Sequence, residues 1–188
     1  MRWNWVFGIL VTLFVILTLT LVGFKINQKK KVSSFVQDLS GLKTIQLTSS
    51  AFQNNQTIPR EYTCNGKNTN PPLTIKGVPS GTISLVLIVD DPDAPRKVWS
   101  HWVVWNLPKE TDLIAPDVLP SKAVVGQNDF KNQCYDGPCP PSGTHHYHFK
   151  IYALNSWLNL DSRATREDLE KAIEGKILGW GELIGTYR

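Results

Sequence analysis

All four histidines of this chain lie in two short segments that also contain acidic residues, proline and glycine. The first segment is Asp-Asp-Pro-Asp-Ala-Pro at residues 90–95, followed by Ser-His-Trp at 100–102. The second is Gly-Pro-Cys-Pro-Pro-Ser-Gly at 137–143, followed by His-His-Tyr-His at 145–148. Imidazole rings can donate, accept or carry charge near neutral pH, and carboxylates can fix which of these a ring does. Together with rigid loops, these groups predict a small polar ligand pocket.

Strands are expected to position these groups. Residues 84–89 form an apolar, β-branched run that ends in acids, which is typical of a buried strand leaving the core. His101 opens the next expected strand, at 102–107. From His145 onward polar and apolar residues alternate, so that His145 and Tyr147 share one face and His146 lies on the other. His101 and His145 are therefore the candidate pocket histidines.

The loop before His145 has features of an anion-binding turn. Proline has no N–H group, so the free N–H groups of Gly137 and of residues 142–144 are the predicted backbone donors. Carboxylates cannot bind an anion directly. Asp91 and Asp93 are instead expected to hold a histidine tautomer, bind a loop N–H or meet the amine of a ligand. The alternative is that these are ordinary turn aspartates and strand histidines.

The C-terminal part of the chain contains the clearest helix signal. Residues 166–174 have one apolar face, with Thr165 as the expected N-cap and Gly175 just beyond the end. Residues 182–187 are predicted to form a short final strand. These elements predict a domain that ends with a helix and one more strand.

The two histidine segments resemble the signatures of the phosphatidylethanolamine-binding protein family, in its bacterial and archaeal Raf-kinase-inhibitor-like branch. The first family motif is Asp-Pro-Asp-Ala-Pro, then a histidine in a hydrophobic strand that leads to Asn-Leu-Pro; here it is 91–95, His101 and 106–108. The second is a Gly-x-Pro-Pro-x-Gly loop followed by His-x-Tyr, found here at 137–147. Further similar stretches extend the resemblance from about residue 46 to residue 188.

The resemblance implies a mainly β fold, in which one large central sheet packs on a smaller sheet, with a few helices including a C-terminal one. It also implies a pocket for phosphate or phosphorylated head groups, and modulation of a protein kinase or protease. By motif position, the implied pocket residues are Asp91, Asp93, Pro95, Trp99, His101, Gly137, Pro138, His145 and Tyr147. His146 departs from the family, which often has arginine there, and this weakens the expectation of a fixed cation beside the pocket.

The cysteines leave two alternatives open. Cys64 and Cys139 lie in family-like motifs, whereas Cys134 is at a position where a small residue without a thiol is expected. A bridge between Cys134 and Cys139 would close a tight loop beside the pocket in an oxidising compartment. Three reduced, structural thiols are the default expectation.

The N-terminal region predicts a membrane anchor. Residues 5–24 are apolar and uncharged, and as a helix they are long enough to span a bilayer. We therefore expect an anchor at 1–26, a basic and polar linker at 27–43 and a ligand-binding domain at 44–188. A long signal peptide cut after Val22 or Gly23 is the alternative.

The side of the membrane depends on two opposing arguments. Lysines follow the apolar stretch, which favours a cytoplasmic domain by the positive-inside rule. Short N-terminal anchors often carry exported domains, and relatives of the resembled family are exported in many bacteria. We therefore expect a single-pass membrane protein with an extracytoplasmic domain.

Charge argues against a nucleic-acid partner. The formal net charge is +4, but residues 40–188 contain 15 basic and 15 acidic residues, so the excess lies in the N-terminal flank. A folded domain that binds nucleic acid needs a basic face, and none is visible.

The residues favour binding over an enzymatic or metal-dependent function. His145 and His148 are three apart on a strand and face opposite sides, so they cannot share one ion without a bulge. Ser100 projects away from His101, and the chain has no Gly-x-Ser-x-Gly motif. The expected function is a non-enzymatic binding domain without cofactor or metal. A hydrolase that uses the same pocket, and a scaffold with a vestigial pocket, are the alternatives.

Overall fold

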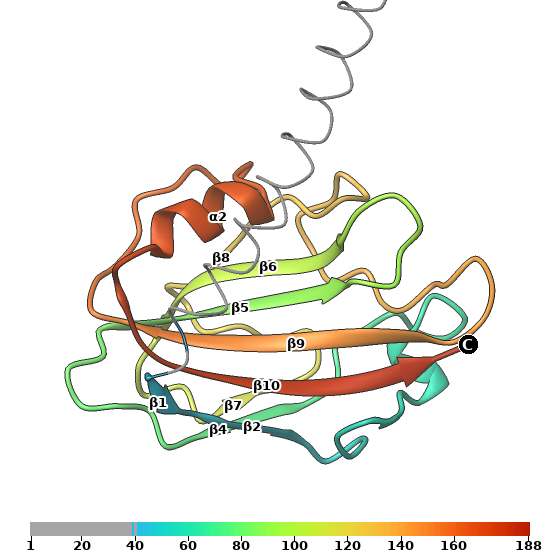
Figure 1. The fold of residues 1–188 in the computed structure, drawn as a ribbon, viewed down its shortest axis with the longest axis horizontal. Helices are drawn as coiled ribbons and strands as arrows, with labels where there is room; N and C mark the ends of the chain where they lie inside the picture. Colours follow the sequence, from blue (N-terminus) through green and yellow to red (C-terminus); the bar gives the residue numbers. More distant parts are fainter. Residues whose placement is uncertain (1–38, 40) are drawn as a thin grey trace, which may run out of the picture. The chain divides into compact units, whose positions relative to one another are not determined.

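The computed structural model describes residue 39 and residues 41–188, and the compact unit within them is Leu42–Arg188. Two β-sheets make up this unit (Figure 1). Its strands, in chain order, are β1 (Lys43–Thr44), β2 (Gln46–Ser49), β3 (Gln56–Thr57), β4 (Leu73–Lys76), β5 (Ser84–Asp91), β6 (Trp99–Pro108), β7 (Leu113–Ile114), β8 (Val124–Val125), β9 (His145–Leu154) and β10 (Ile177–Tyr187). Its helices are the 3₁₀ turn η1 (Arg60–Tyr62) and α2 (Arg166–Ile173).

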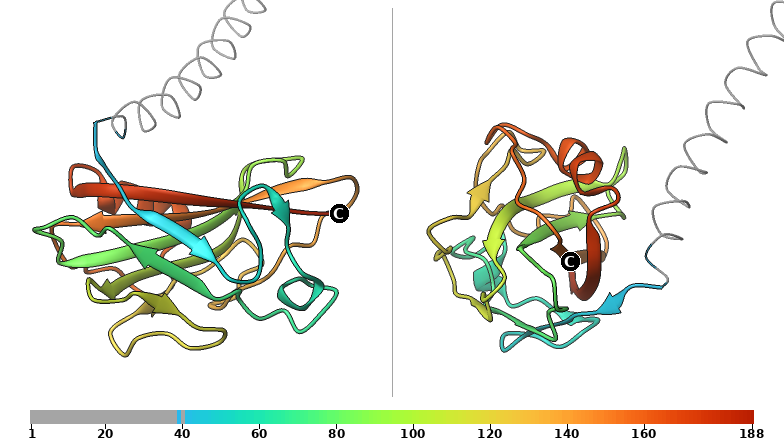
Figure 2. Two further views of the ribbon diagram at one scale, coloured as in Figure 1. Left: turned by 90° about the horizontal axis from the view of Figure 1, so that it is seen from below. Right: turned by 90° about the vertical axis from the view of Figure 1, so that its left-hand side faces the viewer.

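The large sheet has seven strands in the order β1-β10-β9-β5-β6-β8, with β3 beside β10. The small sheet has three strands in the order β2-β4-β7 and faces the large one (Figure 2). Apolar side chains from both sheets form one core, which includes Leu47, Ile75, Leu87 and Phe149. The mainly β fold of two packed sheets that the resemblance implied is therefore confirmed.

Strand β5 lies at the centre of the large sheet, and this explains its composition. All eight of its residues are buried, as expected for an uninterrupted apolar run with a neighbour on each side. It pairs antiparallel with β9, with Val89 opposite Phe149, and antiparallel with β6, with Asp91 opposite Trp99. The last residues of β5 and the first residues of β6 and β9 consequently lie together at one end of the sheet.

Two C-terminal elements match the sequence pattern to different degrees. Helix α2 ends within one residue of the predicted boundary, and Leu169 and Ile173 are its buried residues. The final strand is longer than predicted, because β10 begins at Ile177. Gly179 and Gly181 interrupt the strand pattern in the sequence. A Cβ at Gly181 would lie only 1.9 Å from the carbonyl oxygen of Ile45, so the close approach of the neighbouring segment requires glycine there.

The expected fold class also included an N-terminal transmembrane helix, and that part is corrected. Among residues 39 and 41–188, no helix is long and apolar enough to cross a membrane. Residues 5–24, to which the helix was assigned, lie outside the described residues. The single-pass membrane localisation that was inferred from this helix is corrected with it.

The N-terminus of α2 gives a first prediction. Thr165 and Asp168 form a capping box, in which each side chain binds the backbone N–H of the other residue. Replacing Thr165 with alanine removes one half of this box and is expected to lower the free energy of unfolding by about 1 kcal/mol. Urea denaturation measures the change. Thr165→Ser keeps the hydroxyl and should stay close to the wild type; equal losses in both variants would contradict the capping role.

Candidate functional site

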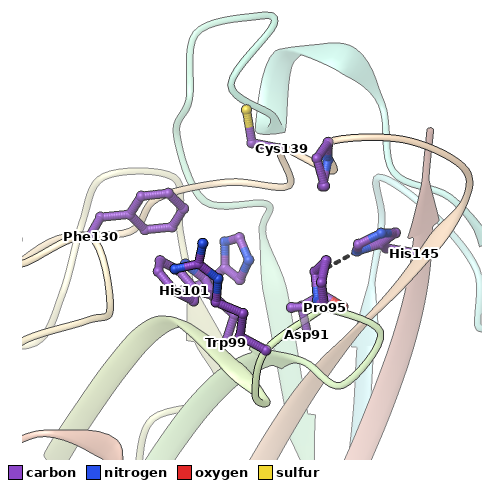
Figure 3. Close-up of a pocket in the computed structure, with 10 residues that line it drawn as sticks. Asp91, Pro95, Trp99, His101, Phe130, Cys139 and His145 are labelled. Atoms are coloured by element: carbon purple, nitrogen blue, oxygen red, sulfur yellow. Dashed lines mark hydrogen bonds and ion pairs between the residues drawn. The ribbon is translucent and has the colours of Figure 1, made fainter.

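A cavity of about 310 Å³ opens at the end of the large sheet where the end of β5 lies beside the beginnings of β6 and β9. Figure 3 shows His145 and its bond to Asp91 on one side, with Trp99 and Phe130 on the other. The cavity is lined by Asp91, Ala94, Pro95, Arg96, Trp99, His101, Phe130, Cys139, Pro141 and His145. Five of the nine predicted site residues are among them: Asp91, Pro95, Trp99, His101 and His145.

The buried pair His145–Asp91 forms one wall. Nδ1 of His145 lies 2.7 Å from Oδ2 of Asp91, and both side chains are less than a tenth exposed. The other oxygen of Asp91 accepts the backbone N–H of Asp93 at 2.9 Å. Because a carboxylate can only accept here, Nδ1 of His145 carries a hydrogen and Nε2 is the remaining polar atom of the ring. Asp91 thus positions a histidine and a loop.

His101 is held differently. Its Nδ1 lies 2.6 Å from the backbone carbonyl oxygen of Asp136, and its ring packs edge-on against Phe130 and Tyr147. Burial lowers the pKa of His101 below its ordinary value, although the Asp136 carbonyl and nearby carboxylates oppose this shift. The ring is therefore neutral at physiological pH. A neutral ring with its hydrogen on Nδ1 has no second hydrogen to donate from Nε2.

Tyr147 lies between the two histidines without lining the cavity. Its ring centroid is 5.2 Å from that of His101 and 6.4 Å from that of His145, and the residue is fully buried. Burial raises the pKa of Tyr147 well above its ordinary value, so the phenol stays neutral. Tyr147 thus supports the two imidazole rings from within the core.

Three further predicted residues secure the loops and do not line the cavity. Asp93 binds both the backbone N–H and Nδ1 of His146. Gly137 donates its N–H to Oδ1 of Asn68, which makes this donor unavailable to a ligand. The carbonyl oxygen of Pro138 accepts the N–H of Cys64. The residues 142–144 are exposed and also lie outside the lining, so the structure does not place the predicted backbone donors in the cavity.

Asp93 gives a second prediction. Hydrogen bonds from His146 lower the pKa of Asp93 below the ordinary 3.8. The bond from the His146 side chain has the larger effect, and the bond from its backbone N–H adds to it. A lowered folded-state pKa stabilises the fold above pH 3.8, and this contribution is lost as the pH falls through the lowered value. Because both side chains are about half exposed, Asp93→Asn should cost less than about 1 kcal/mol at neutral pH. Carboxyl ¹³C NMR should show Asp93 titrating below 3.8, and a higher value would contradict the bond.

Half of the residues that line the cavity were not predicted from the sequence. Arg96 and Ala94 belong to the loop between β5 and β6, and adjacency to the Asp-Pro-Asp-Ala-Pro run was the available signal. Arg96 makes no hydrogen bond or ion pair with any described residue, and its guanidinium is always charged. The cavity therefore has a fixed cation, at a position other than that of His146. Phe130 lies in a loop without a recognisable motif.

Asn128 holds the loop that carries Phe130 and Asp136. It is 2% exposed, and its amide nitrogen donates to the carbonyl of His101 at 3.2 Å and to Oδ2 of Asp136 at 2.6 Å. Its amide oxygen accepts the N–H groups of Phe130 and Asn132, both at 3.0 Å. One buried side chain thus fixes the turn that carries Phe130 and the carbonyl that binds His101.

The disulfide differs from both alternatives drawn from the sequence. Cys139 is bonded to Cys64, 75 residues away, and Cys134 is free and exposed. The expected reduced thiols and the considered Cys134–Cys139 bridge are therefore both wrong. Cys139 lines the cavity, so the disulfide covalently links the wall of the cavity to Cys64, in the segment that follows η1.

The lining indicates what the cavity can do chemically. It combines one guanidinium, two imidazoles with one nitrogen each already engaged, and a rim of aromatic and proline side chains. It contains no serine, threonine or free thiol. Over the described part of the chain, no group of three or more histidine, cysteine and acidic side chains is placed to hold a metal ion.

Comparisons with known proteins agree with this architecture. The sequence profile of the family described as phosphatidylethanolamine-binding protein matches residues 48–188. A UPF0098 protein of Pyrococcus horikoshii is 49% identical over 149 residues, which cover 74% of each chain.

Two solved structures are similar in fold as well as in sequence. A putative phosphatidylethanolamine-binding protein homologue from Chlamydia trachomatis is 40% identical, with a TM-score of 0.74 over 78% of this chain and 98% of that one. YbcL of E. coli, described as a member of the mammalian PEBP family, is 32% identical, with a TM-score of 0.73 over 77% and 98%. With its fold, its paired histidine motifs and these relatives, the chain belongs to the phosphatidylethanolamine-binding protein family.

Proposed function

We propose that this protein is a non-enzymatic binding protein whose cavity takes a small anion that bears phosphate. The observation that carries the proposal is the convergence of Arg96, His101 and His145 on one cavity. A guanidinium matches phosphate oxygens in charge and geometry, and imidazoles add directed hydrogen bonds. The aromatic side chains of Trp99 and Phe130 at the same cavity suit the apolar remainder of a phosphorylated compound.

The absence of serine, threonine and free cysteine from the lining supports binding over turnover through a covalent intermediate on such a residue. A hydrolase of that kind would need a hydroxyl or thiol beside a histidine base, and the sulfur of Cys139 is bonded to Cys64. The family relationship supports the same proposal, because two of its members are named for the binding of phosphatidylethanolamine. We further propose that ligand binding modulates a protein partner, a kinase or a protease.

Calorimetric titration of the full-length protein with inorganic phosphate tests the binding proposal, with chloride used to hold ionic strength constant. His145→Ala should weaken phosphate binding at least tenfold, about 1.4 kcal/mol, because it removes a wall of the cavity. His148→Ala is the matched control. His148 also lies on β9, but it binds Glu182 at 2.7 Å and does not line the cavity, so its loss should leave affinity unchanged.

Equal phosphate affinities of the wild type and His145→Ala would show that the cavity is not the phosphate-binding site. If no anion binds or raises the melting temperature, the scaffold with a vestigial pocket becomes the better explanation. Turnover of phosphate or carboxylate esters that depends on His145 would support the hydrolase instead. For the partner, a kinase or protease panel assayed with and without the protein should show inhibition that phosphate relieves or enhances.

A further inference from the structure

His101 presents an acceptor to the cavity. The carbonyl oxygen of Asp136 can only accept, so Nδ1, at 2.6 Å from it, must carry a hydrogen. In the neutral ring Nε2 then has a lone pair and no hydrogen. Among residues 41–188 no side chain or backbone N–H donates to this atom. A ligand in the cavity therefore meets one nitrogen that accepts and cannot donate.

The surroundings of His101 keep the ring neutral. It is 3% exposed and packs edge-on against Phe130 and Tyr147, which offer no compensating charge. Burial therefore lowers the pKa of His101. The charged or titratable groups around it are Asp90 and Asp91 on β5, Asp136 in the loop before β9, Tyr147 and His145 on β9, and Arg96, which lines the same cavity. Asp91 is bonded to His145 and Asp90 to Lys150, so neither carboxylate binds the His101 ring.

The same cavity also offers donors. Arg96 contributes a permanently charged guanidinium without a partner in the described residues. A ligand that satisfies Arg96 and His101 together must present anionic oxygen to one and a hydrogen-bond donor to the other. A protonated phosphomonoester does both, since it has P–O⁻ oxygens and one P–O–H group.

Extending the proposed function, on which this step rests, we infer that the cavity selects phosphomonoesters in their protonated, singly charged form. The P–O–H group donates to Nε2 of His101, while the charged oxygens accept from Arg96 and from His145 when its Nε2 carries a hydrogen. A sulfate ester of the same shape and charge has no hydrogen to donate. It leaves the His101 nitrogen unpaired in a buried position, which is costly for binding.

Methyl phosphate and methyl sulfate form a matched pair of probes, because below about pH 6 both are monoanions of nearly the same shape. In calorimetric titrations of the full-length protein at pH 5.5, methyl phosphate should bind at least about tenfold more tightly than methyl sulfate. The affinity for total methyl phosphate should then fall about 50-fold from pH 6 to pH 8, as the ligand loses the proton that His101 accepts. Equal affinities for the two probes would overturn the inference. Binding of neither would overturn the proposed function itself.

Two variants separate His101 from the rest of the cavity. A glutamine amide can donate as well as accept, so His101→Gln should bring the two affinities within about threefold of each other. His145→Gln should weaken both probes and leave the preference for methyl phosphate intact. If His101→Gln fails to fold, as judged by circular dichroism, the tautomer of the His101 ring can be measured directly in the wild type. Long-range ¹H–¹⁵N NMR at pH 7 should show Nδ1 protonated and Nε2 unprotonated, and a hydrogen on Nε2 would refute the inference.

Discussion

Replacing Asp91 with asparagine is expected to weaken phosphate binding about tenfold and to lower the free energy of unfolding by about 2 kcal/mol. In the wild type, both carboxylate oxygens accept hydrogen bonds, one from His145 at 2.7 Å and one from the N–H of Asp93 at 2.9 Å. An asparagine can replace only one acceptor. Its NH₂ group would face either the ring Nδ1–H or the loop N–H, so one donor loses its partner within a buried site, or the His145 ring changes tautomer.

Phosphate titration and urea denaturation measure the two effects of Asp91→Asn. The control is Asp93→Asn, which changes the same loop at a half-exposed residue outside the cavity lining. That variant should retain most of the affinity. A normal phosphate affinity in Asp91→Asn would show that the orientation of His145 is not needed for binding.

Loss of the Cys64–Cys139 disulfide is expected to have the largest effect on stability. The bond closes a loop of 75 residues, and releasing a loop of this length in the unfolded chain lowers the free energy of unfolding by about 4 kcal/mol. The Cys64→Ser, Cys139→Ser double variant should therefore unfold at markedly lower urea concentration. Its phosphate affinity should fall only a few-fold, because two hydrogen bonds, from Gly137 to Asn68 and from Cys64 to Pro138, still hold the cavity loop.

Cys134→Ser is the matched control for the disulfide, because Cys134 is free and exposed. It should unfold like the wild type under oxidising conditions. Treatment with dithiothreitol should destabilise the wild type and Cys134→Ser equally and leave the double variant unchanged. If reduction leaves the denaturation midpoint of the wild type in place, the bridge does not contribute to stability.

Much of the architecture follows from local patterns. The uninterrupted apolar run before Asp90 predicted the central strand β5, and the alternation from His145 predicted which histidines of β9 face inward. Thr165 and Gly175 marked the ends of α2 within one residue. These features depend on residues close in sequence, so their periodicity and capping signals are readable without coordinates.

The N-terminal membrane helix was predicted from hydropathy alone, and residues 5–24 lie outside the described residues. The apolar composition of residues 5–24 suggested a spanning helix, whereas no helix capable of spanning a membrane occurs in the described residues, which begin only after that stretch. Hydropathy reports only whether a helix of those residues would suit a bilayer.

The sequence alone predicted that His101, His145 and Asp91 lie at a pocket, because the two motifs contain them, and all three line the cavity. Only the tertiary structure decided what each one does. The carbonyl of Asp136 makes His101 an acceptor, and Asp91 takes Nδ1 of His145. It also decided that Arg96 and Phe130 line the cavity and that Cys64, rather than Cys134, bonds to Cys139. These outcomes depend on strand register and on contacts between distant segments, which fix distances of a few ångströms that composition and spacing do not encode.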